Sequence, residues 1–200
     1  MRIIGGRLKG RVLKSPSSDQ VRPTADRLRE TIFNILIHAY GNPIEGARVI
    51  DLFAGTGAMG LEALSRGAGF VFFVEQAAAA CAILRANIQM LGLEHAARVL
   101  RCDARKLGIA PEGRKYSLIF LDPPYGRGLA PPALAALRDG GWLAEDALLV
   151  IEDSASAMVR LPDGFSLAET RRFGPARIML ACVERDLNPA TRTKIDSSIP

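Results

Sequence analysis

The sequence has few side chains that ligate metals or form disulfide bonds. Its 200 residues include three cysteines, Cys81, Cys102 and Cys182, and two histidines, His38 and His95. No Cys-x-x-Cys pair occurs, so we expect reduced thiols and no metal site. No apolar run approaches the roughly 20 residues of a membrane span, and the first residues lack the apolar segment of a secretory signal. A cytoplasmic protein with no membrane attachment is therefore expected.

The chain has instead a large apolar fraction and a basic beginning. Hydrophobic residues make up 48% of it, which suits one globular domain with a sizeable core. The net charge is +5, and the first 29 residues hold eight cations against Asp19 and Asp26. These cations are Arg2, Arg7, Lys9, Arg11, Lys14, Arg22, Arg27 and Arg29. The cluster indicates a polyanionic partner, although a solvated charged face would give the same pattern.

Hydrophobic periodicity predicts an α/β fold. Residues 2–14 predict a small β-hairpin or arm, with an apolar side made by Ile4, Leu8, Val12 and Leu13. A helix is expected from near residue 24, and strands at 49–53, 70–74, 98–102, 117–121 and 147–151. Helices are expected between them at 58–66, 76–91 and 130–139, and an antiparallel pair of strands at 165–171 and 177–183. This alternation predicts a doubly wound, mostly parallel, seven-stranded sheet.

An acidic residue stands at or near the carboxyl end of each of the first four expected strands. These residues are Asp51, Glu75, Asp103 and Asp122. Open α/β sheets bind their ligands at this edge. Four carboxylates in register therefore predict a single crevice.

Gly55, Gly57 and Gly60 match the pattern Gly-x-Gly-x-x-Gly between the first strand and its helix. Both NAD and S-adenosylmethionine fit such a turn. Asp51 would repel a pyrophosphate but suits a ligand that carries an ammonium and a sulfonium, and Asp103 is placed to meet an adenine amino group. These carboxylates favour a methyl donor.

Residues 118–126 combine a buried-strand pattern with Asp122, Pro123, Pro124 and Tyr125. The prolines remove two N–H donors and aim the local carbonyls rigidly. A carboxylate beside a flat ring suits a planar group that carries hydrogen-bond donors, whereas a packed proline turn would explain the same residues more simply.

At these positions the sequence resembles class I S-adenosylmethionine-dependent methyltransferases. Residues 51–57 look like their motif I, and residues 122–125 look like motif IV of the members that methylate exocyclic amino groups. Segments 2–6, 10–11, 22–24, 29–30, 33–34 and 60–68, with Arg27, are similar to the RsmD family of bacterial 16S rRNA guanine-N2 methyltransferases. The similarity runs from residue 2 to about 183, with Thr56 and Gln76 as departures.

The residues and the resemblance together imply a Rossmann-like methyltransferase domain over 24–185, after a basic arm and linker over 1–23 and before a polar, disordered tail over 186–200. The implied donor is S-adenosyl-L-methionine, bound by Asp51, Phe53, Gly55, Gly57, Glu75, Asp103, Ala104 and Asp122. The implied catalytic residues are Asp122, Pro123, Pro124 and Tyr125. The implied RNA-binding residues are Arg2, Arg7, Lys9, Arg11, Arg22, Arg27 and Arg29.

The implied reaction is methylation of a guanine N2 amine in 16S rRNA, within an assembling 30S subunit, by a monomeric enzyme. Asp122 and the Pro123 carbonyl would accept the amine hydrogens while Tyr125 stacks on the base. Another amino-group methyltransferase, acting on DNA adenine N6, other RNA or a protein amide, stays open. So do a non-catalytic RNA-binding module and an NAD-dependent oxidoreductase. How residues 22–34 divide between covering the donor and binding RNA is left open too.

Overall fold

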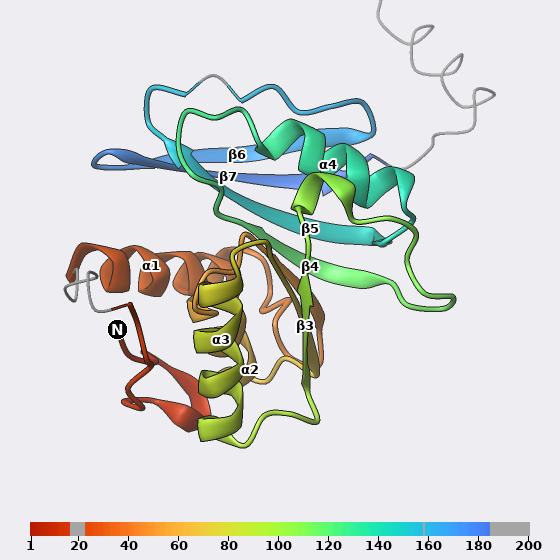
Figure 1. Ribbon diagram of the computed structural model, residues 1–200. Helices are drawn as coiled ribbons and strands as arrows, with labels where there is room; N and C mark the ends of the chain where they lie inside the picture. Colours follow the sequence, from red (N-terminus) through yellow and green to blue (C-terminus); the bar gives the residue numbers. More distant parts are fainter. Residues whose placement is uncertain (17–22, 158, 185–200) are drawn as a thin grey trace, which may run out of the picture.

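A seven-stranded sheet in the order β3-β2-β1-β4-β5-β7-β6 forms the centre of the computed structural model (Figure 1). The structure describes residues 1–16, 23–157 and 159–184. The strands are β1 (Arg48–Leu52), β2 (Phe70–Glu75), β3 (Ala97–Arg101), β4 (Tyr116–Leu121), β5 (Leu143–Ser154), β6 (Phe165–Phe173) and β7 (Ala176–Val183). Strands β1 to β5 pair in parallel, and β7 is antiparallel to both β5 and β6.

Helices cover both faces of this sheet. They are α1 (Pro23–Ala39), α2 (Ala58–Ser65), α3 (Ala78–Leu91) and α4 (Ala130–Asp139), with single 3-10 turns at η1 (Gly6–Leu8) and η2 (Ala104–Lys106). Val49 and Leu118 pack with α1, α2 and α3, while their neighbours Ile50 and Ile119 pack with α4 and η2. Because both faces are covered, the central strands are almost entirely buried and mostly hydrophobic, with Asp51 of β1 as a buried exception.

The structure confirms the predicted fold class and the order of the elements. The largest difference in bounds is in β5, which was expected at 147–151. Its first residue pairs with Tyr116 across an irregularity, and its last three pair with β7 beyond the end of β4. Within the described ranges, no helix is long and apolar enough to cross a membrane. Part of the predicted linker and the whole of the predicted tail lie outside the described residues.

The N-terminal arm, residues 1–16, folds back on itself. Arg2 and Val12 form an isolated antiparallel bridge, and the Ile3 N–H donates to the Arg11 carbonyl at 3.0 Å. The predicted hairpin therefore exists as a single bridge closed by the turn η1.

The apolar side of the arm differs from the expected one. Ile3 and Leu13 are buried in the core with α1 and α2, whereas Val12 is 70% exposed and Ile4 and Leu8 are only partly buried. The expected apolar side was right for Leu13 and wrong for Val12, because an arm with a single bridge has no regular pleat.

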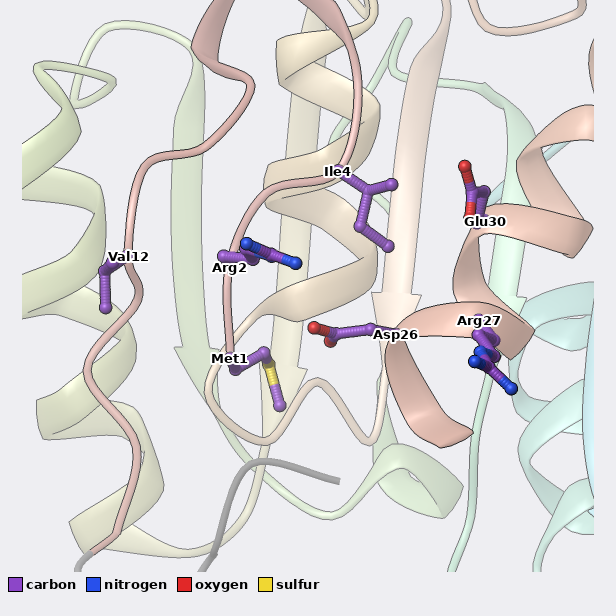
Figure 2. Close-up of a pocket in the computed structure, with 7 residues that line it drawn as sticks. All are labelled: Met1, Arg2, Ile4, Val12, Asp26, Arg27 and Glu30. Atoms are coloured by element: carbon purple, nitrogen blue, oxygen red, sulfur yellow. The ribbon is translucent and has the colours of Figure 1, made fainter. Parts of the chain in front are cut away.

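A hollow of about 600 Å³ lies between the arm and the first turns of α1 (Figure 2). It is lined by Met1, Arg2, Ile4, Val12, Asp26, Arg27 and Glu30. One wall comes from the arm and the other from the helix, so the shape of the hollow depends on how the arm is held against the body.

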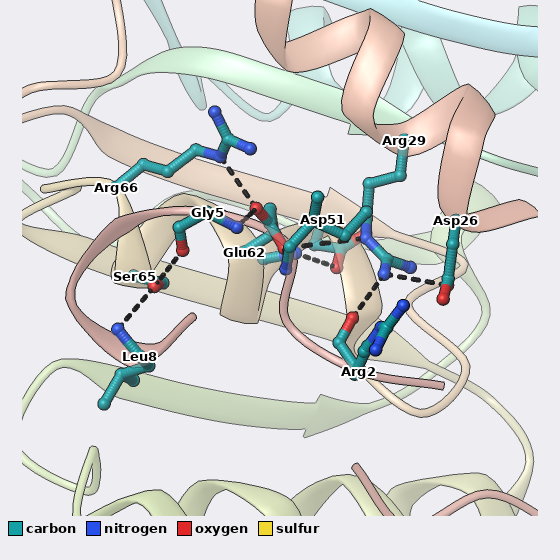
Figure 3. A network of polar contacts seen from close by, with 11 residues as sticks. Arg2, Gly5, Leu8, Asp26, Arg29, Asp51, Glu62, Ser65 and Arg66 are labelled. Carbon is teal, nitrogen blue, oxygen red and sulfur yellow. Dashed lines mark hydrogen bonds and ion pairs between the residues drawn. The ribbon is translucent and has the colours of Figure 1, made fainter. Parts of the chain in front are cut away.

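The buried carboxylate of Glu62, on α2, holds the arm in place (Figure 3). Its Oε2 accepts the N–H of Ile4 at 2.8 Å, and its Oε1 accepts that of Gly5 at 2.7 Å. Arg66 Nε donates to Oε1 at 2.7 Å, and Arg29 Nε lies 3.7 Å from Oε2. One fully buried charge is thus compensated by two guanidinium groups and two backbone donors. We call Glu62, Arg29 and Arg66 the arm clamp.

Ser65, one turn after Glu62, extends the contact between α2 and the arm. Its hydroxyl donates to the Gly5 carbonyl at 2.6 Å and accepts the Leu8 N–H at 2.9 Å. Gly6, between them, has φ +73, and a Cβ there would lie 1.9 Å from the Ser65 carbonyl oxygen. The arm can follow this path only with glycine at position 6.

Asn87, on α3, connects the arm to the turn after β1. Its Oδ1 accepts the Lys14 N–H at 2.8 Å, and its Nδ2 donates to the carbonyls of Lys14 and Thr56, both at 3.1 Å. The far end of the arm and the glycine-rich turn therefore share one buried amide.

We expect Glu62→Gln to lower the free energy of unfolding by about 3–5 kcal/mol, because removing one partner leaves buried charges uncompensated. Urea unfolding measures this change. Hydrogen exchange should also become faster at Ile4 or Gly5, because glutamine keeps only one of the two oxygens that accept their N–H groups. The matched control is Glu94→Gln, an exposed carboxylate, which should stay within about 0.5 kcal/mol of the parent protein. Equal stability of the two variants would contradict the role of the clamp.

Candidate active site

The carboxyl ends of β1, β2, β4 and β5 meet at one edge of the sheet and surround a pocket. Leu52 pairs with Val74 on one side and Leu121 on the other, and Leu121 pairs with Ile151. The residues that follow these partners therefore stand next to one another. The pocket has a volume of about 450 Å³ and is lined by Phe53, Glu75, Gln76, Asp122, Pro123, Pro124, Tyr125 and Glu152.

The turn between β1 and α2 is built from residues with left-handed backbone. Phe53, Gly55 and Gly57 have φ values of +59, +54 and +88. For Phe53 this conformation costs on the order of 1–3 kcal/mol, and it places the aromatic ring in the pocket lining. A Cβ at Gly57 would lie 2.3 Å from Leu84 Cδ1, so this glycine also permits close packing on α3.

Asp51 lies beneath this turn and is 2% exposed. Its Oδ2 accepts the N–H of Gly60 at 2.9 Å, so it satisfies a donor in the first turn of α2, a helix whose N-cap residue makes no side-chain bond. Burial, with help from Asp122 and Glu75, raises the pKa of Asp51 to about 8. The expectation that Asp51 faces a ligand at the mouth of the turn is therefore corrected. Asp51 supports the turn from below, and a role in donor binding stays a prediction.

Glu75, at the end of β2, is fixed by two backbone donors. Its Oε2 accepts the Gly55 N–H at 2.9 Å and its Oε1 accepts the Ala77 N–H at 2.7 Å. Each carboxylate oxygen keeps a lone pair for a further donor, and Glu75 lines the pocket. Because the Gly55 N–H is already bound, it is not free to cradle a phosphate, which disfavours a dinucleotide.

Asp122, Pro123, Pro124 and Tyr125 follow β4 and leave the sheet at the pocket. Asp122 and Pro124 are exposed, Pro123 is buried, and Tyr125 is 45% exposed. The Tyr125 hydroxyl donates to Glu152 Oε1 at 2.5 Å. A carboxylate, a ring and two rigid prolines thus share one pocket wall, as the motif predicted.

Glu152 is the pocket residue that sequence reasoning missed. It comes directly after the strand predicted at 147–151, so the strand-end rule applied to the first four strands would have found it on the fifth. In the structure it lies within β5, opposite Ile178 of β7.

Burial, followed by repulsion between neighbouring acidic groups, raises the pKa values around the pocket. Asp122 is open to the pocket but crowded by protein atoms on its other sides. This partial loss of solvent, together with Glu152 and Asp153, raises its pKa above the usual carboxyl range. Burial and Asp153 also raise the pKa of Glu152, and the hydrogen bond from Tyr125 opposes that shift. Burial and Glu152 in turn raise the pKa of the Tyr125 hydroxyl.

Asp103, expected to meet an adenine amino group, is engaged by its neighbour. Arg105 donates to it from its guanidinium, at 2.6 Å between Nη2 and Oδ2, and from its backbone N–H at 2.9 Å. These bonds lower the pKa of Asp103 to about 2. Ala104, the other residue expected there, is buried at the start of η2. Neither residue lines the pocket at β4, so a role in adenine binding stays a prediction.

The basic residues of the N-terminal region divide into two groups. Arg2, Arg7, Lys9, Arg11 and Arg27 are exposed. Arg29 is 4% exposed, and its guanidinium donates to the Arg2 carbonyl at 2.6 Å and to Asp26 at 3.0 Å. The expectation that Arg29 grips RNA phosphates is corrected, because this side chain belongs to the arm clamp. Arg22 lies outside the described residues.

The residues of the pocket fit S-adenosylmethionine. Glu75 can accept hydrogen bonds from ribose hydroxyls, and Glu75, Asp122 and Glu152 suit a ligand with positive charges. None of the described residues that line the pocket is cationic. The strand order, the glycine-rich turn and this acidic pocket define a class I S-adenosylmethionine-dependent methyltransferase.

Comparisons with known proteins give the family. The family model described as "Conserved hypothetical protein 95" matches residues 1–182. The Escherichia coli (strain K12) protein named ribosomal RNA small subunit methyltransferase D is 40% identical over 175 residues, which are 87% of this chain and 85% of that one. The protein of the same name from Haemophilus influenzae is 33% identical over 176 residues, 87% of this chain and 89% of that one.

A solved structure agrees with these relatives. The Escherichia coli protein yhhF superposes with a TM-score of 0.79 at 36% identity, over 92% of this chain and 98% of that chain. The chain therefore belongs to the family of conserved hypothetical protein 95, the RsmD family.

Binding of S-adenosylmethionine at pH 7 should release protons. The positive charges of the ligand favour the ionised forms of Asp51 and Asp122, and both carboxyls have raised pKa values in the free protein. Isothermal titration calorimetry in two buffers of different ionisation enthalpy measures the number released. Asp122→Asn should release fewer protons than the parent protein. Identical proton counts for the two proteins would contradict a titrating Asp122.

Proposed function

We propose that this protein transfers a methyl group from S-adenosylmethionine to the exocyclic N2 amine of a guanine in 16S rRNA. The target would lie in the assembling 30S subunit, and the enzyme would act as a monomer. The observation that carries the proposal is the pocket in which Asp122, Pro123 and Tyr125 stand beside Glu75 and Phe53. The names of the family relatives from Escherichia coli and Haemophilus influenzae support rRNA of the small subunit as the substrate.

The proposed chemistry begins with a poor nucleophile. The lone pair of guanine N2 is delocalised into the ring, so the amine must be drawn toward tetrahedral geometry before it can react. Asp122 and the carbonyl of Pro123 would each accept one N–H, and this pair of acceptors turns the lone pair out of the ring plane. The ring of Pro123 fixes its φ and the following Pro124 restricts its ψ, so the Pro123 carbonyl is held in place without a hydrogen-bonded strand.

Tyr125 would stack on the base, a contact worth about 1–3 kcal/mol. Its ring is partly exposed, and its hydroxyl is tied to Glu152, so one face can stay open to the base. When bound, S-adenosylmethionine supplies an electrophilic methyl group. The nitrogen forms the new bond to carbon, the sulfur keeps the electrons of the broken bond, and one N–H proton is lost. Alignment of the two reactants can contribute on the order of 7–11 kcal/mol.

Asp122→Asn tests this proposal directly. The amide keeps the shape of the side chain but loses one of the two carboxylate acceptors and the charge. We expect transfer to 30S particles from a strain that lacks the enzyme to fall by at least about a hundredfold, with a much smaller fall in donor affinity. Radiolabelled methyl transfer and calorimetry measure the two quantities, and mapping of the modified base identifies the product.

The matched control is Asp146→Asn, an exposed carboxylate near the other end of β5, which should keep full transfer. Near-normal transfer by the Asp122 variant would sink the assignment. Product at an adenine, or on protein, would replace guanine as the target.

The exposed cations of the arm would bind the RNA backbone. Arg7, Lys9 and Arg11 lie on a segment that the arm clamp and Ser65 hold against α2. No ion pair with another described residue involves them. Their charges are therefore presented by a fixed backbone and are available to phosphates.

Replacing Arg7, Lys9 and Arg11 together by alanine should weaken RNA binding and flatten its salt dependence. Each lost phosphate contact should reduce the slope of log K against log salt by roughly 0.7–0.9. Filter binding across a salt series measures the slope. The control removes three exposed cations at and after β3, namely Arg98, Arg101 and Lys106. Equal flattening by both triple variants would mean that the arm is not a specific RNA-binding surface.

A further inference from the structure

We propose that Glu152 selects guanine by accepting its ring N1–H beside the amine that Asp122 holds. The inference rests on the proposed function and extends it to the way in which the base is chosen. Three observations support it: Glu152 lies on β5, it accepts a hydrogen bond from Tyr125, and no cation among the described residues forms an ion pair with it.

Glu152 is the lateral neighbour of Asp122. Leu121 of β4 pairs in parallel register with Ile151 of β5, so Asp122 and Glu152 are the next residues along adjacent strands. Adjacent strands lie about 4.8 Å apart, and residues in register direct their side chains to the same face. Both side chains line the same pocket. Two carboxylates at this spacing match two hydrogen-bond donors on one edge of a base.

Tyr125 fixes the carboxylate of Glu152. Its hydroxyl donates to Oε1 at 2.5 Å, which limits rotation of the carboxylate and couples it to the ring expected to stack on the base. Within the described part of the chain, no hydrogen bond uses Oε2. The stacking surface and an acceptor are therefore oriented together, and Oε2 is left for a ligand.

The acidic cluster lacks compensation inside the protein. Asp122, Glu152 and Asp153 approach one another, yet no ion pair among the described residues includes any of them. Carboxylates that are partly withdrawn from water are stabilised by hydrogen-bond donors. A ligand edge with several N–H groups would supply them, whereas an edge with a lone pair would be repelled.

The two purines differ at this position. Guanine carries N1–H next to its N2 amine, so these two neighbouring groups on one edge of the base are both hydrogen-bond donors. Adenine presents a bare N1 acceptor next to its N6 amine. A second carboxylate beside Asp122 therefore accepts a hydrogen bond from guanine and opposes the lone pair of adenine N1. Discrimination by an unpaired polar group in a site is far stronger than discrimination by shape.

The test uses a base that keeps the 2-amino group but lacks N1–H. The mapped target guanine is replaced by 2,6-diaminopurine in 16S rRNA, by ligation of a synthetic segment, and the RNA is assembled into 30S particles. For the unsubstituted enzyme, kcat/KM for N2 methylation should be at least about a hundredfold higher with guanine. Glu152→Gln should reduce this ratio by at least about tenfold, because its amide can donate to the bare N1.

Two further variants separate selection from folding. Tyr125→Phe keeps the ring but frees the carboxylate, so it should lower the ratio several-fold, by less than Glu152→Gln does. Glu145→Gln, an exposed position near the start of β5, should leave the ratio unchanged. Circular dichroism and urea unfolding check that each variant is folded. If Glu152→Gln does not fold, the ratio of the unsubstituted enzyme and that of Tyr125→Phe still decide the question.

An unchanged ratio in a folded Glu152→Gln protein would overturn the inference. Equal rates on guanine and 2,6-diaminopurine by the unsubstituted enzyme would also overturn it, while the proposed function would stand. If no guanine is methylated at N2, the proposed function and the inference fail together.

Discussion

The compensation of one buried carboxylate, Glu62, is the constraint on which the arrangement of the N-terminal half depends. Its two oxygens bind two backbone N–H groups of the arm and the guanidinium of Arg66, with Arg29 close by. An uncompensated charge at this depth would be strongly destabilising. The arm, α1 and α2 must therefore stay together. The buried Glu62 carboxylate thus fixes the backbone that carries the exposed cations of the arm.

The active site differs, because its pocket carboxylates form no ion pair with any cation in the part of the chain that the structure describes. Asp51 is buried under the glycine-rich turn, Glu75 is held by two N–H groups, and Asp122 and Glu152 face the pocket. Burial, and then repulsion from neighbouring carboxylates, raises the pKa values of Asp51 and Asp122. A cationic donor and a base edge that carries several donors would relieve it. Glu62 thus stabilises the fold, whereas Asp122 and Glu152 are placed to bind ligands.

Much of the fold was predictable because each element carries a local pattern. The strands that end at Asp51, Glu75 and Asp122 read as apolar runs that terminate in an acid, and the register of the sheet brings two of those acids into one pocket. Local pattern failed where partners are distant in sequence. Arg29 looks like its neighbour Arg27, but it lies against Glu62, 33 residues further along the chain (62 minus 29).

The sequence by itself determined the order of strands and helices, the acidic strand ends, and the Asp122–Tyr125 motif, because periodicity and strand-end chemistry act over a few residues. Only the tertiary structure decided that Asp51 caps α2 from below, that Arg29 is buried, and that Glu152 joins Asp122 and Tyr125. Each of these outcomes depends on the packing of elements far apart along the chain. The sequence gives the charge of a side chain, but the packing of distant elements decides which partner it contacts.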